Sequence, residues 1–197
     1  MRGPGARGAV LLASLATLTS PSSGRAQDPA VLYIGGATLA AVVPGFLFDL
    51  PQPDAGRAFM KASSGVFDAV DDRNRAIDVL IEYQPGYTWH RVKPLFGLAG
   101  NTDGSMYGWI AAAHDIHIGR WLVVNVNSGP ALYVVGEEAK GLGSVGVLRS
   151  GVELGLRFDG DARLTASFHH MSHGKILNPE VNPGAEVIAV NLTWPMN

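Results

Sequence analysis

The chain has 197 residues, of which 47% are hydrophobic, 16% are charged and none is cysteine. Disordered chains are poor in apolar residues, so this composition excludes a disordered protein. The absence of cysteine excludes disulfides and zinc–thiolate sites. The formal net charge is only -2 and no basic stripe runs along the chain, so no nucleic-acid partner is predicted.

The first 26 residues have the three parts of a secretory signal peptide, in the usual order. Met1–Gly8 carries two arginines and no acid, Ala9–Leu18 is apolar, and Thr19–Ala26 is small and polar. This order predicts a signal peptide over residues 1–26 and an exported protein; a buried N-terminal helix is the alternative. Residues 27–60 follow as an N-terminal extension whose apolar run is interrupted by glycine and proline.

From Lys61 onward the chain consists of segments of about ten residues in which apolar and polar residues alternate, separated by turn residues. This pattern is typical of transmembrane β-strands, and bacterial barrels have an even number of them. Residues 61–197 are therefore predicted to form an all-β fold, an eight-stranded antiparallel transmembrane β-barrel. The expected strands are Lys61–Val70, Arg75–Gln84, Arg91–Gly100, Ser105–Asp115, Arg120–Tyr133, Gly146–Phe158, Arg163–Ser172 and Ala185–Trp194.

The sixth of these segments shows the alternation best. Leu148, Val152 and Leu154 share one face, and Arg149 and Glu153 share the other. Because side chains alternate along a strand, the first face is expected to meet lipid and the second to form a paired polar interior. A soluble eight-stranded sandwich or a lipocalin-like barrel has the same period and stays an alternative.

Three tryptophans agree with a barrel whose N-terminus is periplasmic. Trp89 and Trp121 open outward-running strands and Trp194 closes the last strand, so all three are expected at the periplasmic interface. Membrane barrels carry a girdle of aromatic residues at that level. The predicted location is therefore the cell outer membrane.

The motifs that could indicate a cofactor or a metal each lack the context or the further ligand that such a site needs. Gly141–Gly146 matches the dinucleotide fingerprint in letters but lacks a βαβ context. His114 and His117 have no third metal ligand and are interpreted as exposed turn histidines. The glycosylation sequon at Asn191 lies inside the last predicted strand. We therefore predict no cofactor and no metal.

The last hairpin carries the candidate chemistry. His170 and Ser172 are two residues apart, so they project from the same, lipid-facing side of their strand. Glu186 shares the lipid-facing side of the returning strand. Antiparallel pairing brings the start of that strand beside the end of the previous one. A serine, a histidine and a carboxylate are thus predicted to converge outside the barrel, as a nucleophile, its base and an orienting acid.

The same hairpin resembles that of the outer-membrane lipid A 3-O-deacylases, the PagL family, in which His-x-Ser-Asn is followed by Asn-Pro-Gly and an acid. The resemblance covers roughly Gly65 to Trp194. It extends to further stretches of the chain, namely Pro94–Gly97, Asp103–Gly108, Arg149–Gly155 and Ser167–His170. It implies an eight-stranded barrel with a membrane-facing triad in which His170 is the base, Ser172 the nucleophile and Glu186 the acid.

This chain departs from the family pattern after the serine. The family asparagine, an oxyanion contributor, is replaced by His173, and the loop to the acid is longer, with Asn178-Pro179 and Asn182-Pro183 as alternative matches. The oxyanion candidates are therefore the Gly174 backbone N–H and Asn182.

The resemblance implies a cofactor-independent serine esterase that removes the 3-O-linked acyl chain of lipid A in lipopolysaccharide. The implied partner is then lipopolysaccharide in the outer leaflet, which a membrane-embedded enzyme would bind. A homodimer is a further possibility. One alternative is a non-catalytic barrel with a structural or adhesive role, and another is an esterase for a different lipid.

Overall fold

The computed structural model describes residues 36, 39, 43, 53–71 and 74–196. The predicted signal peptide, residues 1–26, and most of the predicted extension, residues 27–60, lie outside the described residues. None of the helical residues that the structure describes belongs to a helix long and apolar enough to cross a membrane.

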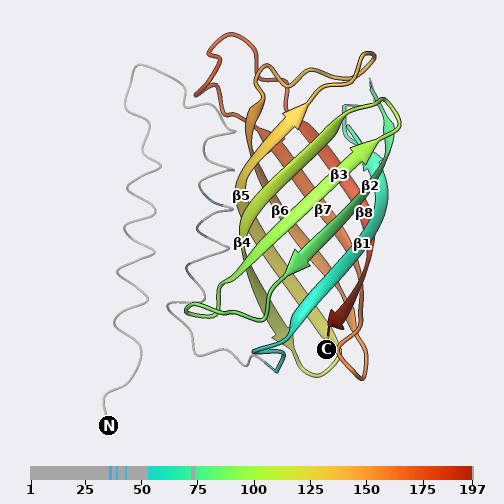
Figure 1. The fold of residues 1–197 in the computed structure, drawn as a ribbon, viewed down its shortest axis with the longest axis vertical. Helices are drawn as coiled ribbons and strands as arrows, with labels where there is room; N and C mark the ends of the chain where they lie inside the picture. The colour runs from blue at the N-terminus through green and yellow to red at the C-terminus, as the bar shows by residue number, and fades with distance from the viewer. Residues whose placement is uncertain (1–35, 37–38, 40–42, 44–52, 72–73, 197) are drawn as a thin grey trace.

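Eight antiparallel strands form a single closed barrel, in which each strand pairs with its neighbours in the chain and the first pairs with the last (Figure 1). The strands are β1 (Ala58–Phe67), β2 (Ala76–Gln84), β3 (Lys93–Asn101), β4 (Met106–Ile118), β5 (Leu122–Val134), β6 (Gly146–Arg157), β7 (Arg163–Ser172) and β8 (Ala185–Met196). The predicted fold class is confirmed.

The first strand differs from its prediction at both ends. β1 begins at Ala58, inside the predicted extension, because β8 runs on to Met196 and offers Ala58 a pairing partner there. It ends at Phe67 rather than Val70, because Asp68 adopts a positive φ of 54° and turns the chain. β4 likewise continues past its predicted end, to Ile118, since a tight turn lets Ile118 pair with Leu122.

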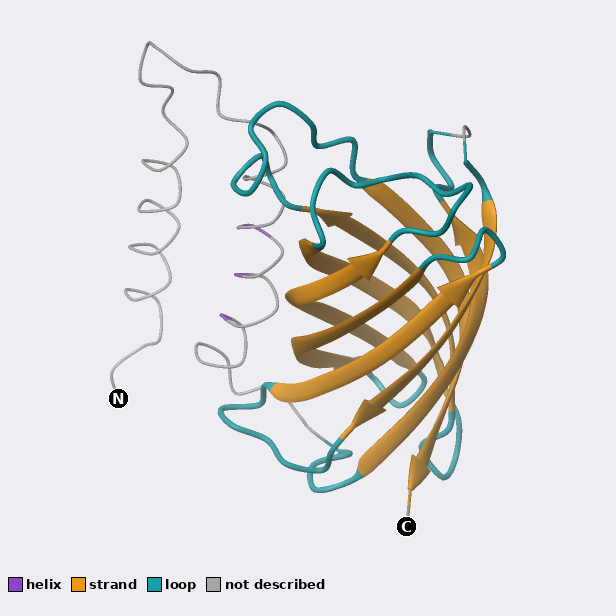
Figure 2. Ribbon diagram, turned by 45° about the horizontal axis from the view of Figure 1, so that its top comes forward, coloured by secondary structure: helices purple, strands orange, loops and turns teal. Residues whose placement is uncertain are grey.

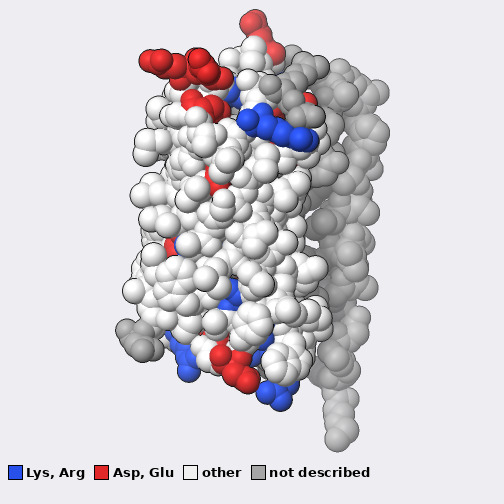
Figure 3. All heavy atoms as spheres, turned by 90° about the vertical axis from the view of Figure 1, so that its right-hand side faces the viewer, with Lys and Arg blue, Asp and Glu red and all other residues white. Residues whose placement is uncertain are grey.

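The outer wall is apolar and the inner wall is polar, as the alternation predicts. On β2 the outward side chains of Ile77, Val79, Ile81 and Tyr83 are all more than 40% exposed, whereas Asp78 and Glu82 are buried. On β6, Leu154 is 57% exposed while Arg149 and Glu153 are buried. In the space-filling view, charged side chains gather at the two ends of the barrel and the band between them carries few (Figure 3). A wall of this kind matches a hydrocarbon environment.

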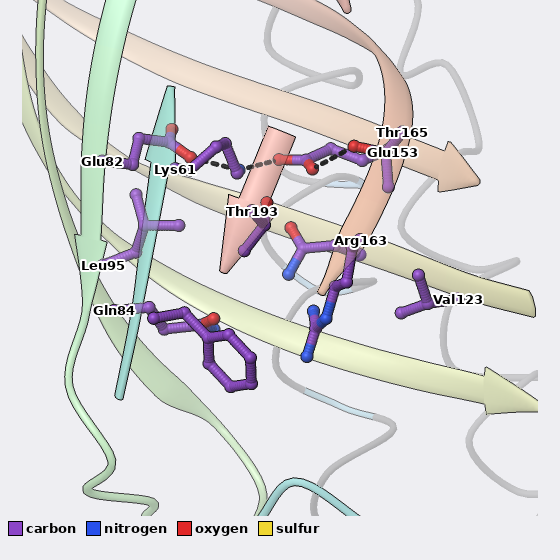
Figure 4. Close-up of a pocket in the computed structure, with 11 residues that line it drawn as sticks. Lys61, Glu82, Gln84, Leu95, Val123, Glu153, Arg163, Thr165 and Thr193 are labelled. Carbon is purple, nitrogen blue, oxygen red and sulfur yellow. Dashed lines mark hydrogen bonds and ion pairs between the residues drawn. The ribbon is translucent and has the colours of Figure 1, made fainter. Parts of the chain in front are cut away.

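Side chains fill the lumen, and charged groups there are paired. Lys61 forms ion pairs with Glu82 and Glu153, and Glu82 also lies 3.4 Å from Arg149. Figure 4 shows the Glu82–Lys61–Glu153 part of this chain of charges, beside a cavity of only about 20 Å³. The guanidinium of Arg149 stacks 3.9 Å from the ring of Trp109. An eight-stranded barrel has an interior just wide enough for such filling, so the structure is not that of an open pore.

The two ends of the barrel differ. At the end that holds the C-terminus the strands are joined by residues 85–92, 119–121 and 158–162, and at the other end by residues 68–75, 102–105, 135–145 and 173–184 (Figure 2). Short periplasmic turns and longer extracellular loops are the rule in outer-membrane barrels. The C-terminal end is therefore the periplasmic one, and Trp121 and Trp194 lie there, half exposed.

Candidate active site

His170 and Glu186 face each other across β7 and β8 on the outer wall. The register makes them direct cross-strand partners, and the His170 Nδ1 atom lies 2.9 Å from Glu186 Oε1. Both side chains are partly exposed. Because the carboxylate accepts a hydrogen from Nδ1, the neutral imidazole carries its lone pair on Nε2. The pair is thus oriented as a general base and its supporting acid.

Ser172 ends β7 two residues beyond His170, on the same face, and is buried. The backbone N–H of Gly174 donates a hydrogen bond to its Oγ atom, at 3.3 Å. The buried Nε2 atom of His170 makes no hydrogen bond within the described part of the chain. The serine and the base are therefore neighbours that are not hydrogen-bonded to each other. In enzymes without bound substrate, such bonds are often long and tighten on substrate binding.

The loop after Ser172 brings both oxyanion candidates close to the serine. Gly174 has a positive φ of 59° and aims its N–H at Ser172. Asn182 accepts a hydrogen bond from the backbone N–H of His173, at 3.2 Å through Oδ1, so its amide nitrogen points its two hydrogens elsewhere. The Gly174 N–H therefore lies at the serine, where a donor can stabilise a negative oxygen, and Asn182 is held at the adjacent residue His173 as the second candidate.

His173, which replaces the family asparagine, links the beginning of this loop to its later part. Its Nε2 atom lies 2.8 Å from the carbonyl oxygen of Val181, and its side chain is buried. A nitrogen that donates to a carbonyl leaves the other ring nitrogen as an acceptor in the neutral imidazole. His173 therefore fixes the loop and is not itself an oxyanion donor in this form.

Gly184 also shapes the site, although it is not among the predicted site residues. Its φ is +65°, and a Cβ atom at this position would lie 3.0 Å from Cε1 of His170. The imidazole thus packs directly on the glycine backbone. The signal was the Asn-Pro-Gly stretch itself, since a glycine after proline often marks a positive φ or a close approach.

The prediction of exposed turn histidines at positions 114 and 117 is wrong, because both lie within β4 and their side chains are buried. His114 is fully buried on the outer wall, with Nδ1 3.0 Å from the carbonyl oxygen of Arg91. His117 faces the lumen, with Nε2 3.3 Å from Asp54. Its side chain is only 3% exposed.

One group of side chains is close enough together to be considered as a set of metal ligands: His117, Asp54 and Asp115. Two cations already occupy this cluster, however. Lys93 Nζ lies 2.9 Å from Asp54, and Arg163 pairs with both acids. Since two positive charges neutralise the two carboxylates, the donor set fits a salt-bridge cluster rather than a divalent cation.

The fold and the position of these side chains define a class of protein: a small outer-membrane-type barrel that carries a histidine, a serine and a glutamate close together on its outer wall. A family model described as Lipid A 3-O-deacylase (PagL) matches residues 78–195. The chain belongs to this family.

Two solved structures share the fold. The crystal structure of the outer membrane enzyme PagL is 15% identical, with a TM-score of 0.55, and the alignment covers 70% of this chain and 99% of that one. A de novo designed transmembrane β-barrel is 10% identical, with a TM-score of 0.52 and coverage of 72% and 97%. A comparison with curated protein sequences gives no match. These likenesses lend no support to a homodimer.

Proposed function

We propose that this protein is an outer-membrane serine esterase that hydrolyses the 3-O-linked acyl ester of lipid A. The family match supports a lipid A deacylase in general terms. The observation that carries the proposal is the His170–Glu186 pair on the outer wall, with Ser172 two residues along the same face of β7 and with His170 Nε2 free of hydrogen bonds to the described residues. Export through the predicted signal peptide, residues 1–26, belongs to the same proposal.

In the proposed first half-reaction, Ser172 Oγ attacks the ester carbonyl carbon and His170 Nε2 takes the serine proton. Glu186 stabilises the imidazolium that forms. The negative charge on the carbonyl oxygen is met by the Gly174 N–H and the Asn182 amide. The sugar oxygen then leaves with the proton from His170, and the acyl group stays on Ser172.

In the second half-reaction, a water molecule gives a proton to His170 and attacks the acyl-enzyme carbonyl. Collapse of the intermediate returns the proton to Ser172 and releases the fatty acid. The side-chain chemistry needs no metal or cofactor, because histidine and serine supply every proton transfer.

The substrate class follows from where these side chains face. They lie on the outer wall at the extracellular end of β7 and β8, so a substrate reaches them from the outer leaflet. Lipopolysaccharide is the ester-bearing lipid of that leaflet. Phospholipid esters there would be the substrate of a different esterase.

The test is mass spectrometry of lipid A and phospholipids from cells with and without this protein. We expect lipid A from producing cells to lose the mass of one hydroxyacyl chain, with phospholipids unchanged. Loss of acyl chains from phospholipids alone would indicate the other esterase. Unchanged spectra of both lipids, with the barrel folded in the membrane, would favour the structural or adhesive barrel.

A further inference from the structure

Four polar residues form one cross-strand row on the outer wall, one on each of the strands β5 to β8. Direct cross-strand pairing links Ser128 to Ser150, Ser150 to His170, and His170 to Glu186. The hydroxyls of Ser128 and Ser150 are 2.8 Å apart. The proposed catalytic base therefore has the acid on one side and a serine pair on the other.

The rows above and below this one are apolar apart from Ser172. The row below consists of Val126, Val152, Phe168 and Ile188, and the row above pairs Pro130 with Leu148 and Leu148 with Ser172. A polar group on a lipid-facing wall costs free energy unless it is hydrogen-bonded. The two serines satisfy this condition through each other, but two alanines would avoid the cost altogether. The pair thus places two hydroxyls on an otherwise apolar part of the wall, next to the proposed base, where a polar group of a bound lipid can meet them.

The serine pair is recessed rather than exposed. Ser128 is 3% exposed and Ser150 is 8% exposed, whereas Val152, one step lower on the same face of β6, is 43% exposed. A hydroxyl has one donor and two acceptor positions. The single bond to Ser128 therefore leaves Ser150 able to bond a further hydroxyl as donor or acceptor.

Ser150 also lies at the right distance from the proposed nucleophile. It is opposite His170, so Ser172 is its diagonal neighbour, a relationship of about 7–8 Å between Cα atoms in a regular sheet. An acyl chain esterified to Ser172 that runs down β6 toward the membrane centre passes Ser150 within a few bonds of the carbonyl carbon. A hydroxyl on that part of the chain would meet the serine pair.

We propose that Ser150, held by Ser128, hydrogen-bonds a hydroxyl group on the substrate acyl chain close to the ester carbonyl. The site thereby selects hydroxyacyl esters over plain acyl esters. This inference rests on the proposed esterase function, since it names residues that bind the acyl chain of the substrate at the same site.

The experiment compares two esters with the purified full-length protein in detergent: p-nitrophenyl 3-hydroxydecanoate and p-nitrophenyl decanoate. The wild type should show a higher kcat/KM for the hydroxylated ester. In Ser150→Ala this preference should fall roughly tenfold, the value of one hydrogen bond to a polar group. The loss should fall on the hydroxylated ester, with little change for the plain one. Ser150→Thr, which keeps a hydroxyl, should retain the preference.

The matched control is Ser167→Ala. Ser167 is also a buried serine bonded across strands, 3.2 Å from Asn191, but it faces the lumen. This variant should keep the wild-type preference. Equal losses on both esters in Ser150→Ala, or an unchanged preference, would overturn the inference. A wild type that hydrolyses both esters equally well would overturn it alone, and one that hydrolyses neither would overturn the proposed function as well.

Discussion

His170 and Glu186 are held together by backbone register: their Cα atoms are direct partners in the β7–β8 ladder and their side chains meet at 2.9 Å. Neither residue depends on a loop for its position. Ser172, by contrast, is the last residue of β7, and the oxyanion candidates lie on the loop that follows. The proposed site thus combines a rigid base and acid with a nucleophile at the boundary between strand and loop.

Replacing Glu186 with Gln tests whether the carboxylate serves the base. The variant keeps the shape but loses the charge that stabilises the imidazolium, a change that costs about 10⁴-fold in a serine protease. We expect roughly a 10- to 1000-fold lower deacylation rate, because a partly exposed carboxylate is partly replaced by water. The measurement is deacylation of purified lipopolysaccharide in detergent, with folding checked by gel mobility.

The control for this variant is Glu180→Gln, since Glu180 is exposed on the loop that precedes β8. It should have the wild-type rate. A folded Glu186→Gln protein with the wild-type rate would reduce the proposed triad to a His–Ser dyad.

Replacing Ser172 with Ala should leave a folded, heat-modifiable barrel whose deacylation rate is lower by orders of magnitude. Members of a triad act as a unit, so loss of the nucleophile removes most of the catalysis. Ser64, an exposed serine on the outer wall of β1, provides the matched control as Ser64→Ala. Near-normal deacylation by Ser172→Ala would remove this serine from the mechanism.

The alternation of residues was enough to predict most of the fold and to place His170, Ser172 and Glu186 on the outer face of one hairpin. β7 has the predicted bounds, Arg163–Ser172, and Arg149 and Leu154 lie on the predicted faces of β6. Parity along a strand assigns a face, and one hairpin connection assigns the neighbour. These two facts suffice for His170, Ser172 and Glu186.

What the sequence could not predict depends on register and on backbone conformation. The row that joins Ser128 to Ser150 and His170 requires the alignment of three strands, which the pattern of each strand alone leaves free. The ends of β1 and β4 depend on how far their partner strands extend. The entry of Asp54 into the barrel base is a tertiary contact between residues far apart in the chain.

Gly184→Ala tests the packing of the imidazole. The substitution adds a Cβ atom 3.0 Å from Cε1 of His170, at a backbone position with φ of +65° that strains any side chain. We expect a folded protein with a deacylation rate at least tenfold lower, because displaced catalytic groups lose their alignment. The control is Gly160→Ala, which has a φ of +84° but open space around its Cβ position. Equal activity of both variants and the wild type would show that Gly184 does not position His170.

Asp54→Asn tests the salt-bridge cluster at the barrel base. Burial alone would raise the pKa of the Asp54 carboxyl, but His117 and the cations Lys93 and Arg163 lower it well below its usual range. A carboxyl with a lowered pKa contributes stability above its unfolded-state pKa of about 3.9, and the contribution is lost as the pH falls toward the folded-state value.

We therefore expect Asp54→Asn to lower the free energy of unfolding by about 3 kcal/mol at pH 7, because Lys93 and Arg163 each lose one of their two carboxylate partners. The difference from the wild type should shrink as the pH falls below about 4. Urea unfolding of the barrel in phospholipid vesicles at several pH values measures both effects. A difference that does not change with pH would show that the charge of Asp54 is not what stabilises the base.

The last prediction separates a membrane-embedded wall from a soluble one. Leu154, inside β6, and Val145, in the loop before it, are 57% and 61% exposed, so solvent exposure alone would make arginine equally tolerable at both positions. If the strand crosses lipid, only Leu154→Arg brings a charge into hydrocarbon, at a cost of about 2–4 kcal/mol near the midplane and less toward the interfaces. We expect Leu154→Arg to lower the free energy of unfolding in phospholipid vesicles by about 2 kcal/mol, with Val145→Arg within about 0.5 kcal/mol of the wild type. Equal stability of the two variants would contradict the lipid-facing assignment of β6, and the proposed access of the substrate from the outer leaflet would fall with it.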